Sequence, residues 1–157
     1  MPVTRCKIDE TARVWHSDLV NLWGCKIGAR TRVAAFVEIG HGVTIGEDCL
    51  IQGFTYIPPG VTIGARVFVG PRVTFTNDKY PPQRDAFVPL TTVVHDDVSI
   101  GAGAVILPGV TLFSGCRIGA GAVVTHDVLP GVTVVGNPAR EMWRRSGHAC
   151  ESEEVCQ

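Results

Sequence analysis

Histidines are the first candidates for acid–base chemistry in this sequence. An imidazole titrates near neutral pH, so a histidine beside a carboxylate can act as a general base. His95 fits this description because Asp96 and Asp97 follow it directly, although a solvated turn is the alternative. His41 stands between two glycines, and His126 lies in what reads as an exposed turn. The sequence therefore favours His95 as the candidate proton acceptor.

The cysteines do not indicate a metal centre or a disulfide framework. There are 6 of them, none forms a CxxC pair, and no secretory signal precedes them. His148, Cys150 and Cys156 lie close together, but they supply only three ligands at a spacing that matches no strong zinc site. We expect no metal.

Length and composition exclude several classes of protein. The chain has 157 residues, enough for one domain with a core, and a net charge of −1. A net charge this close to zero does not favour a protein that binds nucleic acid or anionic membranes. No apolar run approaches the roughly 18 residues of a membrane span, and residues 1–7 do not resemble a signal peptide. We expect a cytoplasmic protein without nucleic-acid or membrane partners.

The elements that position the candidate residues follow a period of six. An aliphatic residue recurs at every sixth position, and a second small or branched residue stands two positions before it. Side chains two apart share one face of a strand, so each hexapeptide predicts a short strand with two inward side chains and then a turn. Glycine often follows the aliphatic residue, and we expect a positive φ there. The main series is Ile27, Val33, Ile39, Ile45, Ile51, Ile57, Ile63, Val69 and Phe75, and it resumes at Val94, Ile100, Ile106, Leu112, Ile118 and Val124.

Strict spacing of this kind predicts a solenoid whose strands stack in parallel one coil apart. The segments IGEDCL (45–50), IGARVF (63–68) and IGAGAV (100–105 and 118–123) resemble the hexapeptide-repeat acyltransferases. The resemblance extends from about Ile8 to Arg140. It implies an all-β fold, a left-handed parallel β-helix with three strands per coil, and a homotrimer with active sites between subunits.

Two regions depart from the repeat. Residues 76–93 contain several prolines and polar residues, which predicts a loop leaving the solenoid, and such loops often carry function. The repeats end near Val128, and we expect a β-helix domain over residues 1–140. Residues 141–157 are expected to form a short helical cap, with Trp143 packed on the last coil, and a tail.

The resemblance also implies acetyl-CoA as the acyl donor. Small residues at Ala102, Gly103, Ala120 and Gly121 would let the pantetheine arm approach the backbone. The segment from Gly136 to Arg140 is similar to the family's Gly-x-Pro-Ala-Arg segment near the adenine and phosphate end. It therefore assigns Asn137, Pro138 and Arg140 to the same ligand, with Arg140 pairing a phosphate.

Residues 68–81 resemble more narrowly the N-acetyltransferases of nucleotide-linked 3-amino sugars, through Val-Gly-Pro and Phe-Thr-Asn-Asp-x-Tyr-Pro. By this resemblance Asn77 lies at the amine being acylated, with Asp78 beside it. Tyr80, Trp15 and His16 then contact the acceptor.

The sequence departs from this family near Gln52. Phe36 and Phe54 stand where members often have asparagine, so two substrate-facing positions are apolar. The expected activity is transfer of acetyl to the 3-amino group of a dTDP- or UDP-linked sugar. An O-acetyltransferase of a sugar or small alcohol is the alternative, and it would need His95 or His41 as the base because no histidine lies between Phe75 and Val94.

Overall fold

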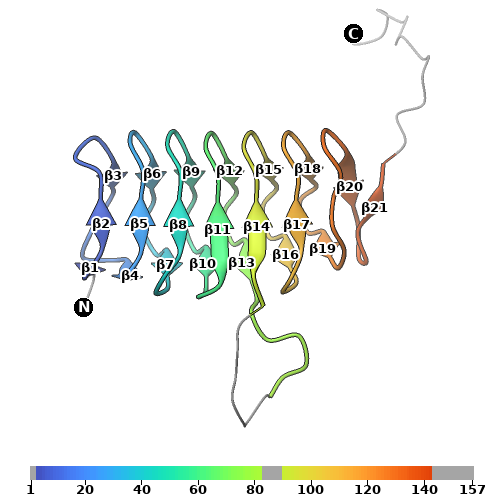
Figure 1. Cartoon of the computed structure of the whole chain (residues 1–157), viewed down its shortest axis with the longest axis horizontal. Helices are drawn as coiled ribbons and strands as arrows, with labels where there is room; N and C mark the ends of the chain where they lie inside the picture. The colour runs from blue at the N-terminus through green and yellow to red at the C-terminus, as the bar shows by residue number, and fades with distance from the viewer. Residues whose placement is uncertain (1–2, 83–89, 143–157) are drawn as a thin grey trace, which may run out of the picture.

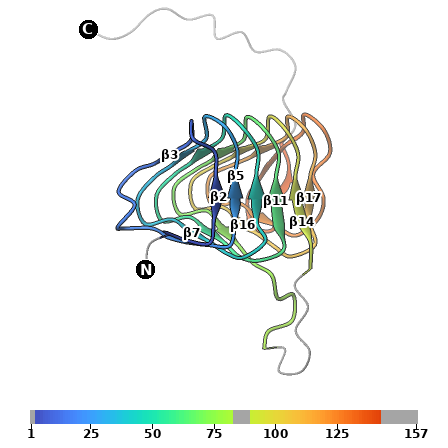
Figure 2. The same cartoon turned by 60° about the vertical axis from the view of Figure 1, so that its left-hand side comes forward.

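The computed structural model describes residues 3–82 and 90–142, which fold into an all-β solenoid (Figure 1). Strands of 2 or 3 residues pass around three faces in turn, and each except β21 pairs in parallel with the strand one coil away. Figure 2 shows the coils from nearer their axis, with the sheets as walls around the interior. The expected fold class is confirmed, and the arrangement is consistent with a left-handed parallel β-helix.

The walls are three sheets, named A, B and C. Sheet A contains β1 (Val3–Thr4), β4 (Asn21–Trp23), β7 (Glu38–Ile39), β10 (Tyr56–Ile57), β13 (Thr74–Phe75), β16 (Val105–Ile106) and β19 (Val123–Val124). Sheet B contains β2 (Lys7–Ile8), β5 (Lys26–Ile27), β8 (Thr44–Ile45), β11 (Val61–Ile63), β14 (Thr92–Val94) and β17 (Thr111–Leu112). Sheet C contains β3 (Arg13–Val14), β6 (Arg32–Val33), β9 (Leu50–Ile51), β12 (Phe68–Val69), β15 (Ser99–Ile100), β18 (Arg117–Ile118), β20 (Thr133–Val135) and β21 (Arg140–Glu141).

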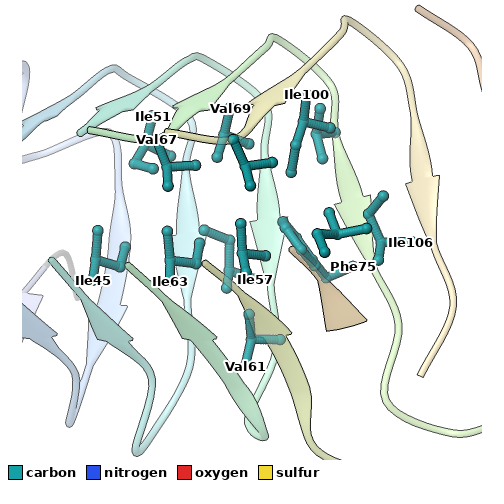
Figure 3. Close-up of a cluster of buried hydrophobic side chains, with 14 of the residues drawn as sticks. Ile45, Ile51, Ile57, Val61, Ile63, Val67, Val69, Phe75, Ile100 and Ile106 are labelled. Atoms are coloured by element: carbon teal, nitrogen blue, oxygen red, sulfur yellow. The ribbon is translucent and has the colours of Figure 1, made fainter. Parts of the chain in front are cut away.

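The predicted inward positions form the core. The aliphatic residues of the main series are at most 3% exposed, and they stack in register, as Ile45, Ile63 and Val94 do across sheet B. Figure 3 shows these columns, with Phe75 extending into the interior beside Ile106. Burying one such side chain contributes roughly 1.5–3 kcal/mol. Cys49 and Cys116 also occupy the core as expected.

The prediction of a positive φ at the glycines that follow the aliphatic residues is wrong. Gly46 and Gly64 do not have positive φ. A Cβ on Gly46 would instead lie 2.5 Å from the carbonyl oxygen of Gly64, and one on Gly28 would lie 2.7 Å from that of Gly46. These glycines are needed because successive coils touch backbone to backbone. Positive φ falls two residues after the glycine, for example at Asp48 and Arg66.

Three corners connect the sheets. The A–B corner joins sheet A to sheet B, the B–C corner joins B to C, and the C–A corner joins C to the next coil. Residues with positive φ line each corner in equivalent positions one coil apart. At the C–A corner they include Phe36, Phe54, Arg72, Gly103 and Gly121, with His16 one turn earlier, and at the B–C corner they are Arg30, Asp48, Arg66, Asp97, Gly115 and Gly131.

The loop and the C-terminal segment, the two regions that depart from the repeat, each differ in part from the prediction. The loop leaves the A–B corner between β13 and β14, as predicted, but Thr92 and Val93 already belong to β14 (Figure 1). Glu141 is not helical, because β21 pairs antiparallel with the edge of β20 and the N–H of Met142 donates to the carbonyl of Thr133 (2.8 Å). A short antiparallel hairpin therefore replaces the start of the expected helix. The rest of the expected cap, including Trp143, lies outside the described residues.

Candidate active site

Most of the residues predicted to bind donor or acceptor meet along the C–A corner. Trp15 and His16 follow β3 at this corner, and Gln52 precedes Phe54 at the same turn two coils later. Trp15 is 54% exposed, and its backbone N–H donates to the carbonyl of Val33 (2.8 Å). The repeat therefore brings together residues that lie far apart in the sequence.

The backbone is bare where this corner carries glycine. Gly103 and Gly121 have φ of +68°, and a Cβ built on either would meet no atom within 4 Å. Ala102 and Ala120, which precede them, are also exposed. The chain thus offers an open strip of backbone on which an extended arm could lie, so the residues present fit the predicted pantetheine contact.

Towards the N-terminus the same corner becomes aromatic. The rings of Phe36 and Phe54 stack with centroids 4.8 Å apart and planes 15° apart, although they are 51% and 60% exposed. The guanidinium of Arg72 lies 5.9 Å from the centre of the Phe54 ring. Positive φ is unusual for a bulky side chain, and such positions concentrate at functional sites. We call these three residues the aromatic step.

The segment from Gly136 to Arg140 follows β20 and closes back on the last coil. The carbonyl of Gly136 accepts the N–H of Val123 (2.9 Å), and the N–H of Ala139 donates to the carbonyl of Val123 (2.8 Å). Arg140 is exposed, and its Nη1 donates to the carbonyl of Ala139 (2.9 Å). The Arg140 side chain is therefore accessible to an anion, as the phosphate prediction requires.

The predicted acceptor loop begins at a different corner. The Asn77 amide Nδ2 donates to the carbonyl of Pro59 (3.4 Å), and the N–H of Tyr80 donates to Oδ1 of Asp78 (3.0 Å). The Tyr80 side chain is 74% exposed. Asn77 is thus held on the A–B corner while Tyr80 extends into solvent.

His95 lies at the third corner, the B–C corner, where its ring stacks on Phe113 with centroids 5.3 Å apart. Its acidic neighbours are engaged elsewhere. Arg66 pairs with Asp97 (2.7 Å) and Asp96 (3.3 Å), and its hydrogen bond lowers the pKa of Asp97. The expectation that an adjacent carboxylate orients His95 is therefore not met.

A single chain does not bring the three predicted catalytic residues together. Asn77 and Asp78 precede β14, whereas His95 follows it, so they lie at opposite ends of that strand. Arg72 and Arg66 were missed. Arg72 could have been found, because it follows Phe36 and Phe54 at the coil period, whereas the partners of Arg66 lie beyond the loop insertion.

Within residues 3–82 and 90–142, no group of three His, Cys, Asp or Glu side chains is placed to hold a metal ion. His148, Cys150 and Cys156 lie outside the described residues. That same described part contains no helix long and apolar enough to cross a membrane.

The hexapeptides match a known family pattern. The bacterial transferase hexapeptide family (six repeats) matches residues 24–58, 42–77 and 91–126, more than half of the chain. Nodulation protein L of Rhizobium meliloti is 37% identical, over 85% of this chain and 77% of its own length. The chain belongs to the hexapeptide-repeat transferase family.

Other relatives of this hexapeptide-repeat protein are longer. A serine acetyltransferase of Bacillus licheniformis is 37% identical over 117 residues, which are 74% of this chain and 44% of that protein. A putative acetyltransferase of Schizosaccharomyces pombe is 41% identical over 85 residues, or 51% of this chain. The chain spans 41–44% of the length of these two relatives.

Solved structures share the fold of the hexapeptide-repeat chain. The N-acyltransferase AntD from Bacillus cereus, in complex with dTDP and 3-hydroxybutyryl-CoA, superposes with a TM-score of 0.68. It is 21% identical, with 92% of this chain and 82% of AntD covered. PerB from Caulobacter crescentus, in complex with CoA and GDP-perosamine, gives 0.64 at 22% identity, covering 90% of this chain and 57% of PerB.

Proposed function

We propose that the protein is an acetyl-CoA-dependent N-acetyltransferase that acts on the 3-amino group of a dTDP- or UDP-linked amino sugar. The observation that carries the proposal is the open backbone at Gly103 and Gly121, in line with the aromatic step at one exposed corner. AntD and PerB, which share the fold, are an N-acyltransferase and a perosamine-binding protein whose structures hold coenzyme A or acyl-CoA.

Coenzyme A would supply an acetyl thioester that an amine can attack. In the proposal, the backbone beside Gly103 and Gly121 holds the pantetheine arm, and Arg140 with Asn137 and Pro138 holds the phosphate end. Backbone N–H groups at this corner would stabilise the negative charge that develops on the carbonyl oxygen, although those of Gly103 and Gly121 already donate to the carbonyls of Pro71 and Ala102 (each 2.8 Å). With coenzyme A bound in this way, the thioester lies at the aromatic step, where the sugar ring of the acceptor packs against Phe54 and Phe36.

Asn77 and Asp78 orient the amine in this mechanism. An amine needs no strong protein base once it is neutral, so its proton leaves to water or to the substrate. His95 would be a further acceptor only if the assembly brought a B–C corner to the site, because His95 lies at the opposite end of β14 from Asn77. The amine attacks the thioester carbon, the carbon–sulfur bond breaks, and the departing thiolate takes up a proton. Trp15, His16 and Tyr80 contact the rest of the acceptor.

We infer that the working enzyme is a homotrimer. Asn77 lies on the A–B corner, whereas the donor residues lie on the C–A corner of the same chain. A second copy whose A–B corner faced this C–A corner would bring the two sets together, and closed cyclic symmetry would repeat the site. A cytoplasmic location fits substrates that are soluble and charged.

O-acetylation is the second candidate, because the relatives by sequence include serine acetyltransferases. It would require His95 or His41 as a base, since a hydroxyl does not lose its proton at neutral pH. Both imidazoles are accessible: His95 and His41 are exposed at their corners.

The test is release of coenzyme A thiol from acetyl-CoA with a panel of acceptors. The panel contains dTDP- and UDP-linked 3-amino sugars, the matching 4-amino sugars, and sugars that carry hydroxyls only. Release with the 3-amino compounds supports the proposal and identifies the nucleotide. Release only with the 4-amino compounds would correct the position of the amine, and release only with hydroxyl acceptors would establish the second candidate.

A further inference from the structure

Two thiols touch across the first two coils. Cys6 precedes β2 and Cys25 precedes β5, and the strands pair Lys7 with Lys26, so the two cysteines occupy equivalent positions one coil apart. The N–H of Lys7 donates to the carbonyl of Cys25 (2.8 Å). Their Sγ atoms are 3.4 Å apart. Neighbouring strands lie about 4.8 Å apart, within the range of Cα separations that a disulfide spans.

The two sulfur atoms differ in environment. Cys25 is 1% exposed, whereas Cys6 is only partly buried. The Cys25 thiol donates to Sγ of Cys6, and the Cys6 thiol donates to the carbonyl of Thr4 (3.3 Å). Burial, together with the hydrogen bond to Cys6, raises the pKa of Cys25 to about 12. Cys6 is therefore the thiol that a reagent in solution meets first, with Cys25 directly behind it.

The other core cysteines have no such arrangement. Cys49 and Cys116 are fully buried, and burial raises the pKa of each thiol. The Cys49 thiol donates to the carbonyl of Gly64 (3.1 Å). Within the described chain, neither lies against another cysteine. They provide internal controls for reactivity.

We propose that Cys6 and Cys25 form an oxidation site that closes into a disulfide through exchange with a small-molecule disulfide. The Cys6 thiolate attacks one sulfur of the reagent and expels one thiolate, which leaves a mixed disulfide on Cys6. Cys25 then loses its proton to solvent and attacks the Cys6 sulfur, and the second thiolate leaves. One reagent disulfide becomes two thiols, while the two cysteines lose two electrons and two protons.

The bond would join the first coil to the second at the A–B corner. These coils carry Trp15 and His16, so the disulfide would fix the N-terminal part of the C–A corner without touching it. Closing the loop between the two cysteines restricts the unfolded chain, which raises the resistance of the first coil to local unfolding. The inference does not depend on the proposed activity.

The test uses the full chain with Cys150→Ser and Cys156→Ser, incubated with oxidised glutathione. We expect a loss of about 2 Da in the intact mass, reversed by dithiothreitol, with no retained glutathione. Trypsin cleaves after Arg5, Lys7, Arg13 and Lys26, so the non-reduced digest should contain residues 6–7 joined to residues 14–26.

Single variants separate the two steps. Cys25→Ser should trap glutathione on Cys6, and Cys6→Ser should leave Cys25 unmodified. Cys25→Ala repeats the first test without placing a hydroxyl in the core, and Cys49→Ser should leave the cross-link intact. Stable glutathione on Cys6 in the presence of Cys25 would overturn the proposal, as would a cross-link that includes Cys49 or Cys116.

Discussion

The B–C and C–A corners share one backbone design but carry opposite kinds of side chain. Both place a residue of positive φ at the same point of each coil. At the B–C corner the first four of these residues are charged and pair with one another, as Arg30 does with Asp48 (2.6 Å) and Arg66 with Asp97 (2.7 Å), and the last two are Gly115 and Gly131. At the C–A corner they begin with the stacked Phe36 and Phe54, followed by Arg72, and they likewise end in glycines, Gly103 and Gly121. The two corners therefore differ in the side chains of their N-terminal coils and not in their backbone, and only the C–A corner combines bare glycines with a stacked pair of phenylalanines.

The largest expected effect comes from covering the bare strip. Gly103→Phe should lower kcat/KM for acetyl-CoA by about 100-fold, because a ring would displace the thioester from its reactive position. The corner tolerates this residue, since Phe36 and Phe54 occupy equivalent turns. Steady-state thiol-release kinetics measure the effect.

Gly115→Phe at the B–C corner is the matched control. Gly115 has φ of +70°, so both variants share the same conformational cost of about 1 kcal/mol. Equal losses of activity in the two would show that the corners do not differ in function.

A smaller effect is expected at the A–B corner. Asn77→Ala should reduce kcat roughly tenfold, because one neutral hydrogen bond to the amine is lost, while the mass of the assembly in light scattering stays unchanged. Thr76→Val, which removes the neighbouring hydroxyl bonded to the carbonyl of Ile106 (3.2 Å), is the control. Unaltered turnover in Asn77→Ala would remove Asn77 from the mechanism.

The aromatic step should affect acceptor binding more than chemistry. Asparagine accepts positive φ better than phenylalanine, so Phe36→Asn with Phe54→Asn should not unfold the protein. Loss of the ring contacts should raise KM for the acceptor about fivefold with kcat little changed. Asp48→Asn also places an asparagine at a position of positive φ, but at the B–C corner, and should leave KM as it is. A drop in kcat alone would mean that the rings act on the reacting atoms instead.

The smallest effect concerns the charged corner and pH. Hydrogen bonds from Arg30 and Arg66 lower the pKa of Asp48 and Asp97 below the ordinary value. A lowered folded pKa stabilises the protein above the unfolded pKa of about 3.9, and the contribution disappears as pH falls further.

The double variant Arg30→Gln and Arg66→Gln should therefore unfold at lower urea than the parent at pH 6, with a difference that shrinks towards pH 3. Arg117→Gln serves as the control, because Arg117 forms no ion pair among the described residues. A difference that does not depend on pH would contradict the electrostatic origin.

The sequence predicted the strands and the core well, because their signal is local. Each hexapeptide carries its own inward pair, and the stacking of Ile45 on Ile63 follows from the period. It failed where pairing outside the repeat decides the outcome. Glu141 pairs with β20 in a hairpin that the hexapeptide pattern does not include, and the carboxylates beside His95 bind Arg66, 30 or 31 residues away across the loop.

Only some of the site residues could have been assigned to their corners from the sequence. Phe36, Phe54 and Arg72 keep the coil period, whereas the loop breaks the count before Gly103. The glycines illustrate a different limit. Their position was clear from the sequence, but the contact between Gly46 and Gly64 that requires them appears only when two coils are placed together.

The contact between glycine backbones also fixes the spacing between coils. Because glycine backbones touch, the coils cannot move apart or together, and the rise per coil stays near the strand spacing of about 4.8 Å. From Phe36 to Gly121 the C–A corner takes four such steps, or about 19 Å. The length of a ligand that can lie along this corner is therefore set by the number of coils. Adding or removing one coil would change that length by one strand spacing.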